Sequence, residues 1–380
     1  MLKTYFLHWP IIFALVTSSC SIEIAQPPVE TPTSQPSVLS PTDSAVNNGT
    51  ALETTQIPVT WASLNLTGKF VYNMGAVEDD NYIVRVLMLD LVTGKLTSIY
   101  TAPLNAWVYY VSVSPDHKQL IMSYSPPLQE NPDVVQALHT MPLDGSEPPQ
   151  LLFTPPTPQD QYTQAEWSPD GKYIYYTHVN YQIPNDPNRI YPLYNIFRMA
   201  YPGGRPESIA EGAYWPRLSL DASRLVYVSV DPLSIQHQLK IADADGGNVQ
   251  EVVLSGSYTP DIKDAPIFSP DGQTLIFSAP VPVPPPAYPL NWFEKLMGIH
   301  IARANGSIPS DWWSVPVSGG ALTRLTQIQA SGLYASLSPD GKHLVSFSGS
   351  GIFVMNLDGS ELTILVPNLD GFTGTVSWTP

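Results

Sequence analysis

The sequence lacks features that define several common classes of protein. A single cysteine among 380 residues excludes a framework of disulfide bonds. Only 13% of the residues are charged and 40 are proline, which excludes a coiled coil or long helix. No apolar run reaches the roughly 18 residues of a membrane-spanning helix. Basic residues are scarce, 17 against 33 acidic, so no nucleic-acid partner is expected.

What the chain does contain is typical of an all-β protein. It has 24 glycines and 40 prolines, which favour turns, together with 9 Trp, 20 Tyr and 11 Phe, which favour strands. Its length is sufficient for one large domain.

The first 19 residues have the pattern of a signal peptide. Lys3 is the only basic residue before Lys69, and an apolar stretch from Tyr5 to Val16 leads to small residues and then to Cys20. The run Val16-Thr17-Ser18-Ser19-Cys20 resembles the lipobox of bacterial lipoproteins, although a threonine stands where Leu or Val is usual.

This resemblance implies cleavage before Cys20 and attachment of diacylglycerol and palmitate-like acyl chains there. The protein is then expected outside the cytoplasm, held on a bacterial membrane by this lipid anchor alone. The alternative is an ordinary secreted protein with an incidental cysteine. Residues 20–60 are predicted to form a disordered tether, because 18 of residues 21–60 are Pro, Ser or Thr and none is basic.

A turn motif recurs along residues 61–380. Its clearest copy is Ser168-Pro169-Asp170-Gly171, between two runs of apolar and aromatic residues. The aspartates of the five copies, with steps of 54, 51, 50 and 69 residues, are Asp116, Asp170, Asp221, Asp271 and Asp340. Periods near 50 residues are typical of propeller blades. We interpret these aspartates as organisers of turns.

A second glycine-containing turn follows each motif, so each repeat forms two hairpins and therefore a four-stranded blade. Six second turns accompany only five first turns. The sixth motif is split: Val376-Ser377-Trp378-Thr379-Pro380 supplies its first half and Thr67-Gly68-Lys69-Phe70 its second. The sequence thus predicts a six-bladed β-propeller whose first blade joins strands from both ends of the domain.

This pattern resembles the TolB-like propeller repeats, relatives of the Trp-Asp repeat propellers, over about residues 65–380. TolB carries an α/β domain before its propeller, and the predicted tether occupies that place here. The resemblance implies the fold, and the partners of TolB do not transfer with it.

One face of the propeller is predicted to carry long, variable loops between the second and third strands of each blade, the first of them through Gly75–Tyr82. Such loops on a rigid scaffold often bind ligands. The loop of the fifth blade contains Trp292 and Phe293, which form either a partner-contacting projection or a cover folded over the adjacent blade. Candidates for the mouth of the central channel are Trp107, Tyr109, Tyr162, Glu166, Tyr214, Trp215, Arg217, Asp264 and Tyr334.

Aromatic rings with a few charges suit a sugar or peptide ligand, and simple packing at the rim is the alternative. No Gly-x-Ser-x-Gly motif occurs, and the seven histidines have no metal-ligand spacing, so no cofactor or metal is expected. We therefore expect a non-catalytic, monomeric binding or scaffold module for an envelope protein or glycan. The alternative is a propeller-type polysaccharide lyase or hydrolase with its site at the channel mouth.

Overall fold

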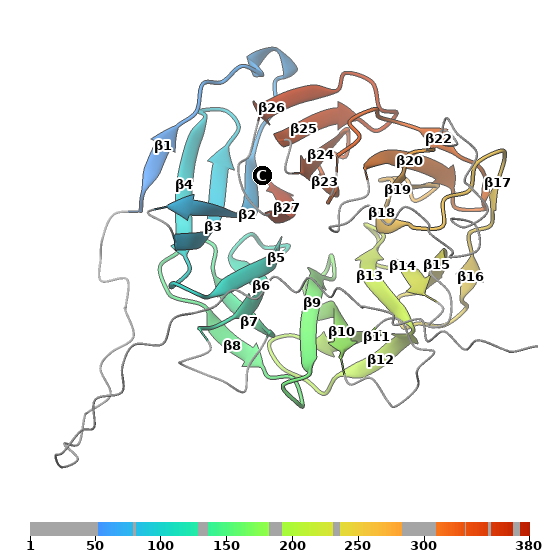
Figure 1. Cartoon of the computed structure of the whole chain (residues 1–380), viewed down its shortest axis with the longest axis horizontal. Coiled ribbons are helices and arrows are strands. Elements are labelled where there is room, and N and C mark those ends of the chain that lie inside the picture. Colours follow the sequence, from blue (N-terminus) through green and yellow to red (C-terminus); the bar gives the residue numbers. More distant parts are fainter. Residues whose placement is uncertain are drawn as a thin grey trace, which may run out of the picture. The chain divides into compact units, whose positions relative to one another are not determined.

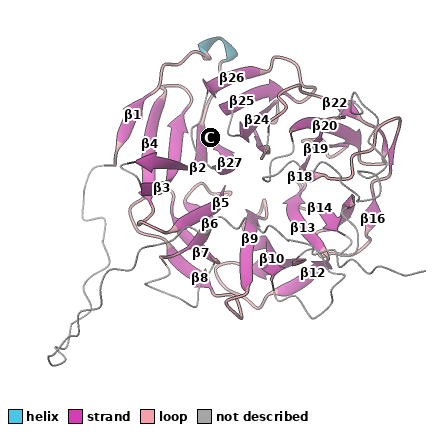
Figure 2. Cartoon of the chain, in the orientation of Figure 1, coloured by secondary structure: helices cyan, strands magenta, loops and turns pink. Residues whose placement is uncertain are grey.

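The computed structural model describes residues 52–78, 81–127, 136–181, 192–230, 236–282, 309–330, 332–348, 351–367 and 373–380. All of them belong to one unit, Val46–Pro380. Within this part, strands dominate and η1 (Ala62–Leu64) is a short 3₁₀ helix (Figure 2). The predicted signal peptide, Cys20, most of the predicted tether, Trp292 and Phe293 lie outside the described residues.

Six antiparallel sheets are arranged as blades around a central axis, which confirms the predicted six-bladed propeller (Figure 1). From the innermost strand outward, blade 1 consists of β27 (Thr373–Thr379), β2 (Lys69–Glu78), β3 (Asn81–Asp90), β4 (Lys95–Thr101) and β1 (Thr54–Gln56), and blade 2 of β5 (Trp107–Val113), β6 (Gln119–Ser125), β7 (Ala137–Pro142) and β8 (Gln150–Phe153). Blade 3 consists of β9 (Asp160–Trp167), β10 (Tyr173–Asn180), β11 (Leu193–Ala200) and β12 (Glu207–Glu211), and blade 4 of β13 (Ala213–Leu218), β14 (Arg224–Val230), β15 (His237–Asp243) and β16 (Gln250–Glu251). Blade 5 consists of β18 (Asp264–Phe268), β19 (Thr274–Pro280), β20 (Ser310–Pro316) and β22 (Thr323–Arg324), and blade 6 of β23 (Tyr334–Leu337), β24 (His343–Ser348), β25 (Gly351–Asn356) and β26 (Thr363–Pro367).

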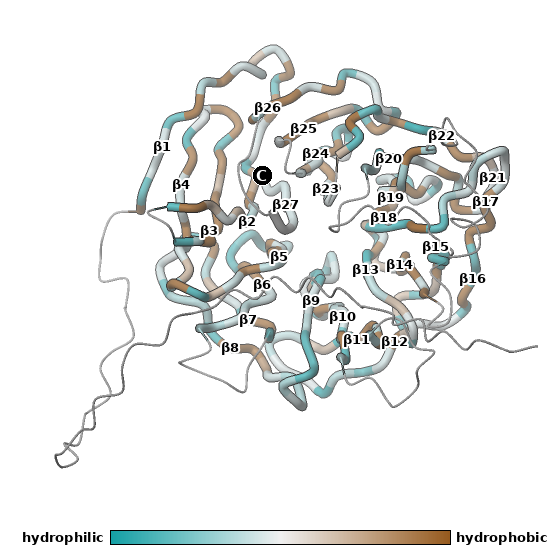
Figure 3. The backbone as a smooth tube through the Cα atoms, viewed as in Figure 1, coloured by the Kyte–Doolittle hydropathy of each residue, from teal (hydrophilic) through white to brown (hydrophobic). Residues whose placement is uncertain are grey.

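Apolar residues along the strands supply the core between neighbouring blades (Figure 3). Blades 1 and 6, for example, meet through Tyr72 and Phe347, whose ring centroids are 5.3 Å apart and which are both fully buried. Each blade buries one side against its neighbour before it and the other against its neighbour after it. The sheets therefore stabilise one another around the ring.

The repeated Ser-x-Asp motif forms the turn between the first and second strands, as the sequence predicts. In blade 3, Ser168 Oγ donates to Asp170 Oδ1 (2.7 Å) and accepts the backbone N–H of Tyr173 (2.9 Å). The same pair of contacts occurs at Ser114, Ser219, Ser269 and Ser338. We call the face that carries these turns the turn face, and the opposite face, where the inner strands begin, the loop face.

The ring closes through β27, which lies next to β2 in blade 1, as the split motif predicts. Phe70 pairs with Trp378 across the two strands, and their rings contact edge to face at 4.8 Å. The indole Nε1 of Trp378 also donates to Thr67 O (2.9 Å). The chain ends of this domain are thus joined by backbone pairing and by a buried aromatic contact.

Blade 1 includes residues that precede the predicted domain boundary at residue 61. Strand β1 pairs with β4 as a fifth, outer strand, with Gln56 opposite Lys95. Trp61, only 1% exposed, donates its Nε1 to Leu91 O (2.8 Å) and packs in the core shared by blades 1 and 6. The Pro, Ser and Thr content of residues 20–60 predicts a tether here, but backbone pairing holds Thr54–Gln56 on the sheet. Trp61 lies at the start of the predicted domain.

The first of the predicted long loops is also corrected. Strands β2 and β3 continue as a hairpin to Glu78 and Asn81, which pair directly, so the connection spans only residues 79–80. Arg85 forms an ion pair with Glu78 across the hairpin. A glycine at position 75 does not interrupt the pairing, since it lies opposite Val84 within the ladder.

Candidate functional site at the central channel

Two sets of positions in the inner strands can be located from the repeat, and we call each set a ring; members of both rings meet at the central channel. One ring lies four residues before the repeated serine or threonine, nearer the loop face, and consists of Tyr110, Gln164, Trp215, Ala265, Tyr334 and Thr375. The other lies two residues before it, nearer the turn face, and consists of Ser112, Glu166, Arg217, Ile267, Ser336 and Ser377.

Bulges in the inner strands aim the first ring. The pairing register shifts at this position in β9, β13 and β18. The bulge residues Gln164 (φ 53°), Trp215 (φ 59°) and Ala265 (φ 48°) have left-handed backbone conformations that non-glycine residues rarely adopt. Gln164 Oε1 accepts the backbone N–H of Trp215 (2.9 Å) and the hydroxyl of Thr177 (2.7 Å), which holds two of these bulges together.

Three aromatic residues of the first ring meet at the axis and form a plug. Tyr110 of blade 2, Trp215 of blade 4 and Tyr334 of blade 6 have ring centroids 5.2 to 6.1 Å apart. Burial raises the pKa of the Tyr110 phenol, and it raises the pKa of Tyr334 well above its usual value. Both phenols therefore remain neutral donors at physiological pH, and the plug is uncharged.

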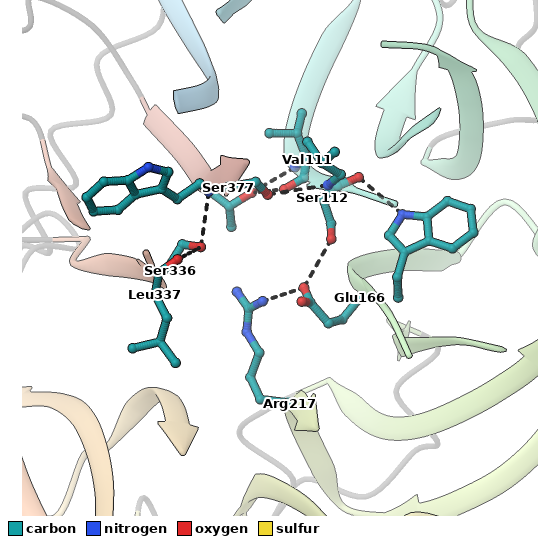
Figure 4. Close-up of polar contacts among 11 residues, drawn as sticks. Val111, Ser112, Glu166, Arg217, Ser336, Leu337 and Ser377 are labelled. Carbon is teal, nitrogen blue, oxygen red and sulfur yellow. Dashed lines mark hydrogen bonds and ion pairs between the residues drawn. The ribbon is translucent and has the colours of Figure 1, made fainter. Parts of the chain in front are cut away.

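Glu166 and Arg217 lie below this plug, toward the turn face. The Arg217 guanidinium pairs with the Glu166 carboxylate, which also accepts a hydrogen bond from Ser112 Oγ at 3.2 Å (Figure 4). A cavity of about 10 Å³ separates the plug from this ion pair, enough for about one water molecule. The sequence predicted both residues at the channel mouth; they line the channel behind the aromatic rings.

Tyr214 and Asp264 form a second polar cluster beside the plug. Tyr214 Oη donates to Asp264 Oδ1 at 2.5 Å and lies 3.0 Å from His237 Nδ1. Burial raises the pKa of Asp264, an effect that the hydrogen bond from Tyr214 opposes, and burial raises the pKa of Tyr214 well above its usual value. The buried ammonium of Lys263 donates to His237 O (2.6 Å) and Pro260 O (2.5 Å).

Three stacked rings lie on the loop face where blades 1 and 2 meet. Tyr82 stacks on Trp107 with centroids 4.8 Å apart, and Trp107 stacks on Tyr109 at 6.2 Å with an interplanar angle of 19°. All three side chains are partly exposed. We call Tyr82, Trp107 and Tyr109 the aromatic ladder. Its residues come from two blades, so blade packing fixes its geometry.

The structure thus separates the predicted mouth residues into groups with different surroundings. Trp107 and Tyr109 are on the loop face, Trp215 and Tyr334 are in the plug, Tyr214 and Asp264 are beside it, and Glu166 and Arg217 are below it. Tyr162 is placed elsewhere: it is buried against Phe153 and Tyr176, at centroid distances of 4.6 and 5.1 Å, between blades 2 and 3.

The prediction missed several residues of this site. Tyr110 and Gln164 share the repeat position of Trp215 and Tyr334, so an alignment of the repeats on their serines identifies them. Tyr82 and His237 lie on the third strands of their blades, counted from the axis, and no sequence pattern marks them as neighbours of the mouth.

Two further observations concern the described residues only. No group of three or more His, Cys, Asp or Glu side chains there is arranged to hold a metal ion. No helix in the same residues has the length and hydrophobicity required to cross a bilayer.

Comparison with known proteins shows the fold. No protein-family profile matches the sequence, and no curated protein is significantly similar to it. Among solved structures, TolB from Acinetobacter baumannii superposes with a TM-score of 0.55 at 15% identity, covering 82% of this chain and 67% of that one. A structure assigned to TolB from Agrobacterium tumefaciens gives 0.50 at 17% identity, covering 83% of this chain and all of that one.

A chain in the crystal structure of a nidogen/laminin complex matches with a TM-score of 0.51 at 10% identity, over 82% of this chain and 98% of that one. The chain therefore has a TolB-like six-bladed propeller fold, as its repeats predict.

Proposed function

We propose that this protein is an extracytoplasmic binding module that engages an envelope protein or glycan through its loop face. The observation that carries the proposal is the partly exposed aromatic ladder beside a channel closed by its own rings. Cys20 would hold the module at a bacterial membrane through its lipid, and residues 20–51 would place the propeller at a distance from the bilayer.

The ladder suits a ligand with flat apolar faces. The three contacting rings are partly exposed and held in place by one another, and rigid aromatic side chains lose little conformational entropy when a ligand binds. Sugar rings and proline-containing or aromatic peptides both offer such faces. Trp107 is central, because it contacts both other rings of the ladder.

The closed channel supports binding by a surface rather than by a deep cavity. Tyr110, Trp215 and Tyr334 fill the axis, and behind them Glu166 and Arg217 neutralise each other. These contacts link blades 2, 3, 4 and 6 across the centre. They keep the loop face rigid, so a ligand meets a preorganised surface.

Substitution of Trp107 tests the proposal. Full-length protein in detergent is immobilised and exposed to purified envelope polysaccharides and to solubilised envelope proteins. We expect binding of one class, weakened about tenfold or more by Trp107→Ala, because central aromatic residues dominate binding energy. The matched control is Tyr173→Ala, which removes a partly exposed ring near the turn face and should leave the affinity unchanged.

Equal affinities of the two variants would contradict the proposed binding face. Release of new reducing or unsaturated sugar ends from a polysaccharide would instead favour the alternative of a propeller lyase or hydrolase.

A further inference from the structure

We propose that a groove between blades 5 and 6 on the turn face binds an extended, basic segment of a partner protein. This site lies on the face opposite the aromatic ladder and is independent of the ligand proposed there. It would allow the protein to hold two partners at once.

The groove has a volume of about 510 Å³ and is lined by apolar residues, which we call its floor, and by polar residues, which we call its walls. Ile276, Leu325 and Leu357 contribute to the floor; the two leucines are partly exposed and pack on the core of blades 4 to 6. Hydroxyl groups of Ser314 and Thr323 stand along the wall formed by blade 5. Such a surface offers apolar contact for alternate side chains and hydrogen bonds for an extended backbone.

Two aspartates give the groove a negative rim. Asp271 belongs to the first turn of blade 5 and Asp358 to the last turn of blade 6. Hydrogen bonds from Ser269 and Ser360 hold the pKa of each carboxyl below its usual value, so both are ionised at neutral pH. In the described part of the chain neither carboxylate forms an ion pair with Lys, Arg or His.

The equivalent groove between blades 1 and 2 provides an internal comparison. It has a volume of about 400 Å³ and repeats the apolar lining, with Met88 and Leu143, and the acidic residue, with Asp144. It differs in its cations, since Lys69, His117 and Lys118 line it. The strand register places Lys69 at the position that Thr274 occupies in the groove between blades 5 and 6. The fold therefore provides the groove, and side-chain charge distinguishes the two copies.

These features favour a basic peptide over other occupants. Two carboxylates facing an apolar floor attract Lys or Arg flanked by apolar residues, and they repel the anionic head groups of a membrane surface. A strand-like segment places alternate side chains on one side, so apolar residues can contact the floor while basic residues on the other side reach the rim.

The test uses a fluorescent six-residue peptide that alternates leucine and lysine, measured by anisotropy with the full-length protein in detergent. We expect saturable binding that weakens as ionic strength increases. A peptide with glutamate in place of lysine, and one with serine in place of leucine, should not bind. The double variant Asp271→Asn with Asp358→Asn should weaken binding about fivefold or more.

The matched control removes two aspartates from the corresponding turns of blade 2, Asp116→Asn with Asp144→Asn. It loses the same formal charge, so it should change the affinity less than twofold if the groove is specific. Equal losses of peptide affinity in the two double variants would show non-specific attraction to an acidic protein and overturn the proposal. Absence of saturable binding to the wild-type protein would overturn it as well.

A further variant distinguishes loss of peptide binding from loss of folding. Thr274→Lys introduces the cation found in the groove of blades 1 and 2 and leaves both aspartates in place. It should abolish binding while the thermal melt stays cooperative. Unchanged affinity in a folded Thr274→Lys protein would place the peptide elsewhere.

Discussion

Ser168 satisfies two polar groups at once, and the same is true of the serines at this position in four other blades. Its hydroxyl donates to Asp170 and accepts the N–H of Tyr173, while the side chain itself is buried. We expect Ser168→Ala to lower the free energy of unfolding by about 1–3 kcal/mol, because a buried N–H loses its acceptor. Urea denaturation of the purified protein measures this change.

The control for this substitution lies four residues later in the same turn. Lys172 pairs with Asp170 at 3.0 Å, but both side chains are largely in solvent. Lys172→Ala should therefore change the stability by about 0.5 kcal/mol or less. Similar losses from the two variants would show that the buried hydroxyl is not what stabilises the turn.

His139 makes stability depend on pH. Burial against Tyr124 lowers the pKa of its imidazole from 6.5 to about 4. Because the unfolded chain binds this proton more readily, stability decreases as the pH falls through about 6.5 and levels off near 4. The loss approaches about 3 kcal/mol at the acidic end of this window.

Denaturation of the wild type and of His139→Phe between pH 7 and 4 isolates this contribution. Phenylalanine preserves an aromatic ring beside Tyr124 and cannot be protonated. The variant should lack the extra pH dependence of the wild type, and parallel curves for the two proteins would contradict the assignment to His139.

At the scale of elements, the sequence predicts the strands well and their irregularities poorly. Five copies of the Ser-x-Asp turn set the period and the number of blades, because a tight turn needs particular residue types. Register shifts do not require particular residue types, since Gln164, Trp215 and Ala265 adopt left-handed conformations although none of them is glycine. Tertiary contacts, such as the bond between Gln164 and Trp215, hold these bulges.

The candidate site shows the same limit. Its first ring follows from the repeat, since Tyr110, Trp215 and Tyr334 share one position. Tyr162 was assigned to the mouth from its place near the start of an inner strand, yet its ring is buried between blades 2 and 3. The bulge determines which side of an inner strand faces the channel. The alternation of apolar residues is the same whether a side chain faces the channel or the space between blades, so it does not distinguish the two.

Strand β27 is the element on which ring closure depends. Deleting residues 373–380 removes the inner strand of blade 1 and the buried contact of Trp378 with Phe70. It also leaves the backbone hydrogen-bonding edge of β2 without its partner strand. We expect a large fall in melting temperature and loss of a single cooperative transition, measured by calorimetry. Deletion of Pro380 alone, which is exposed and follows the strand, should leave the melt unchanged.

At the scale of the whole molecule, the two faces carry different chemistry on one rigid ring. The loop face has the aromatic ladder and the closed channel, and the turn face has grooves between blades that differ in charge. The net charge of −16 is compatible with the acidic groove between blades 5 and 6.

Substitution of Cys20 tests the proposed location of the molecule. Cys20→Ser removes the only sulfhydryl that could carry the lipid, so the protein should move from the membrane fraction to the soluble fraction of the envelope. Immunoblots of fractionated cells measure this shift. Retention of the variant on membranes would exclude the anchor and leave the folded domain and its two faces unaffected.

Closure by β27 also has a consequence for biosynthesis. A ribosome makes the seven residues Thr373–Thr379 after every other strand of the ring, so blade 1 stays incomplete while the other five blades emerge. Until then the edge of β2 that pairs with β27 is open to pairing with other chains. A nascent chain that stalls before residue 373 is therefore expected to be a target for chaperones and proteases.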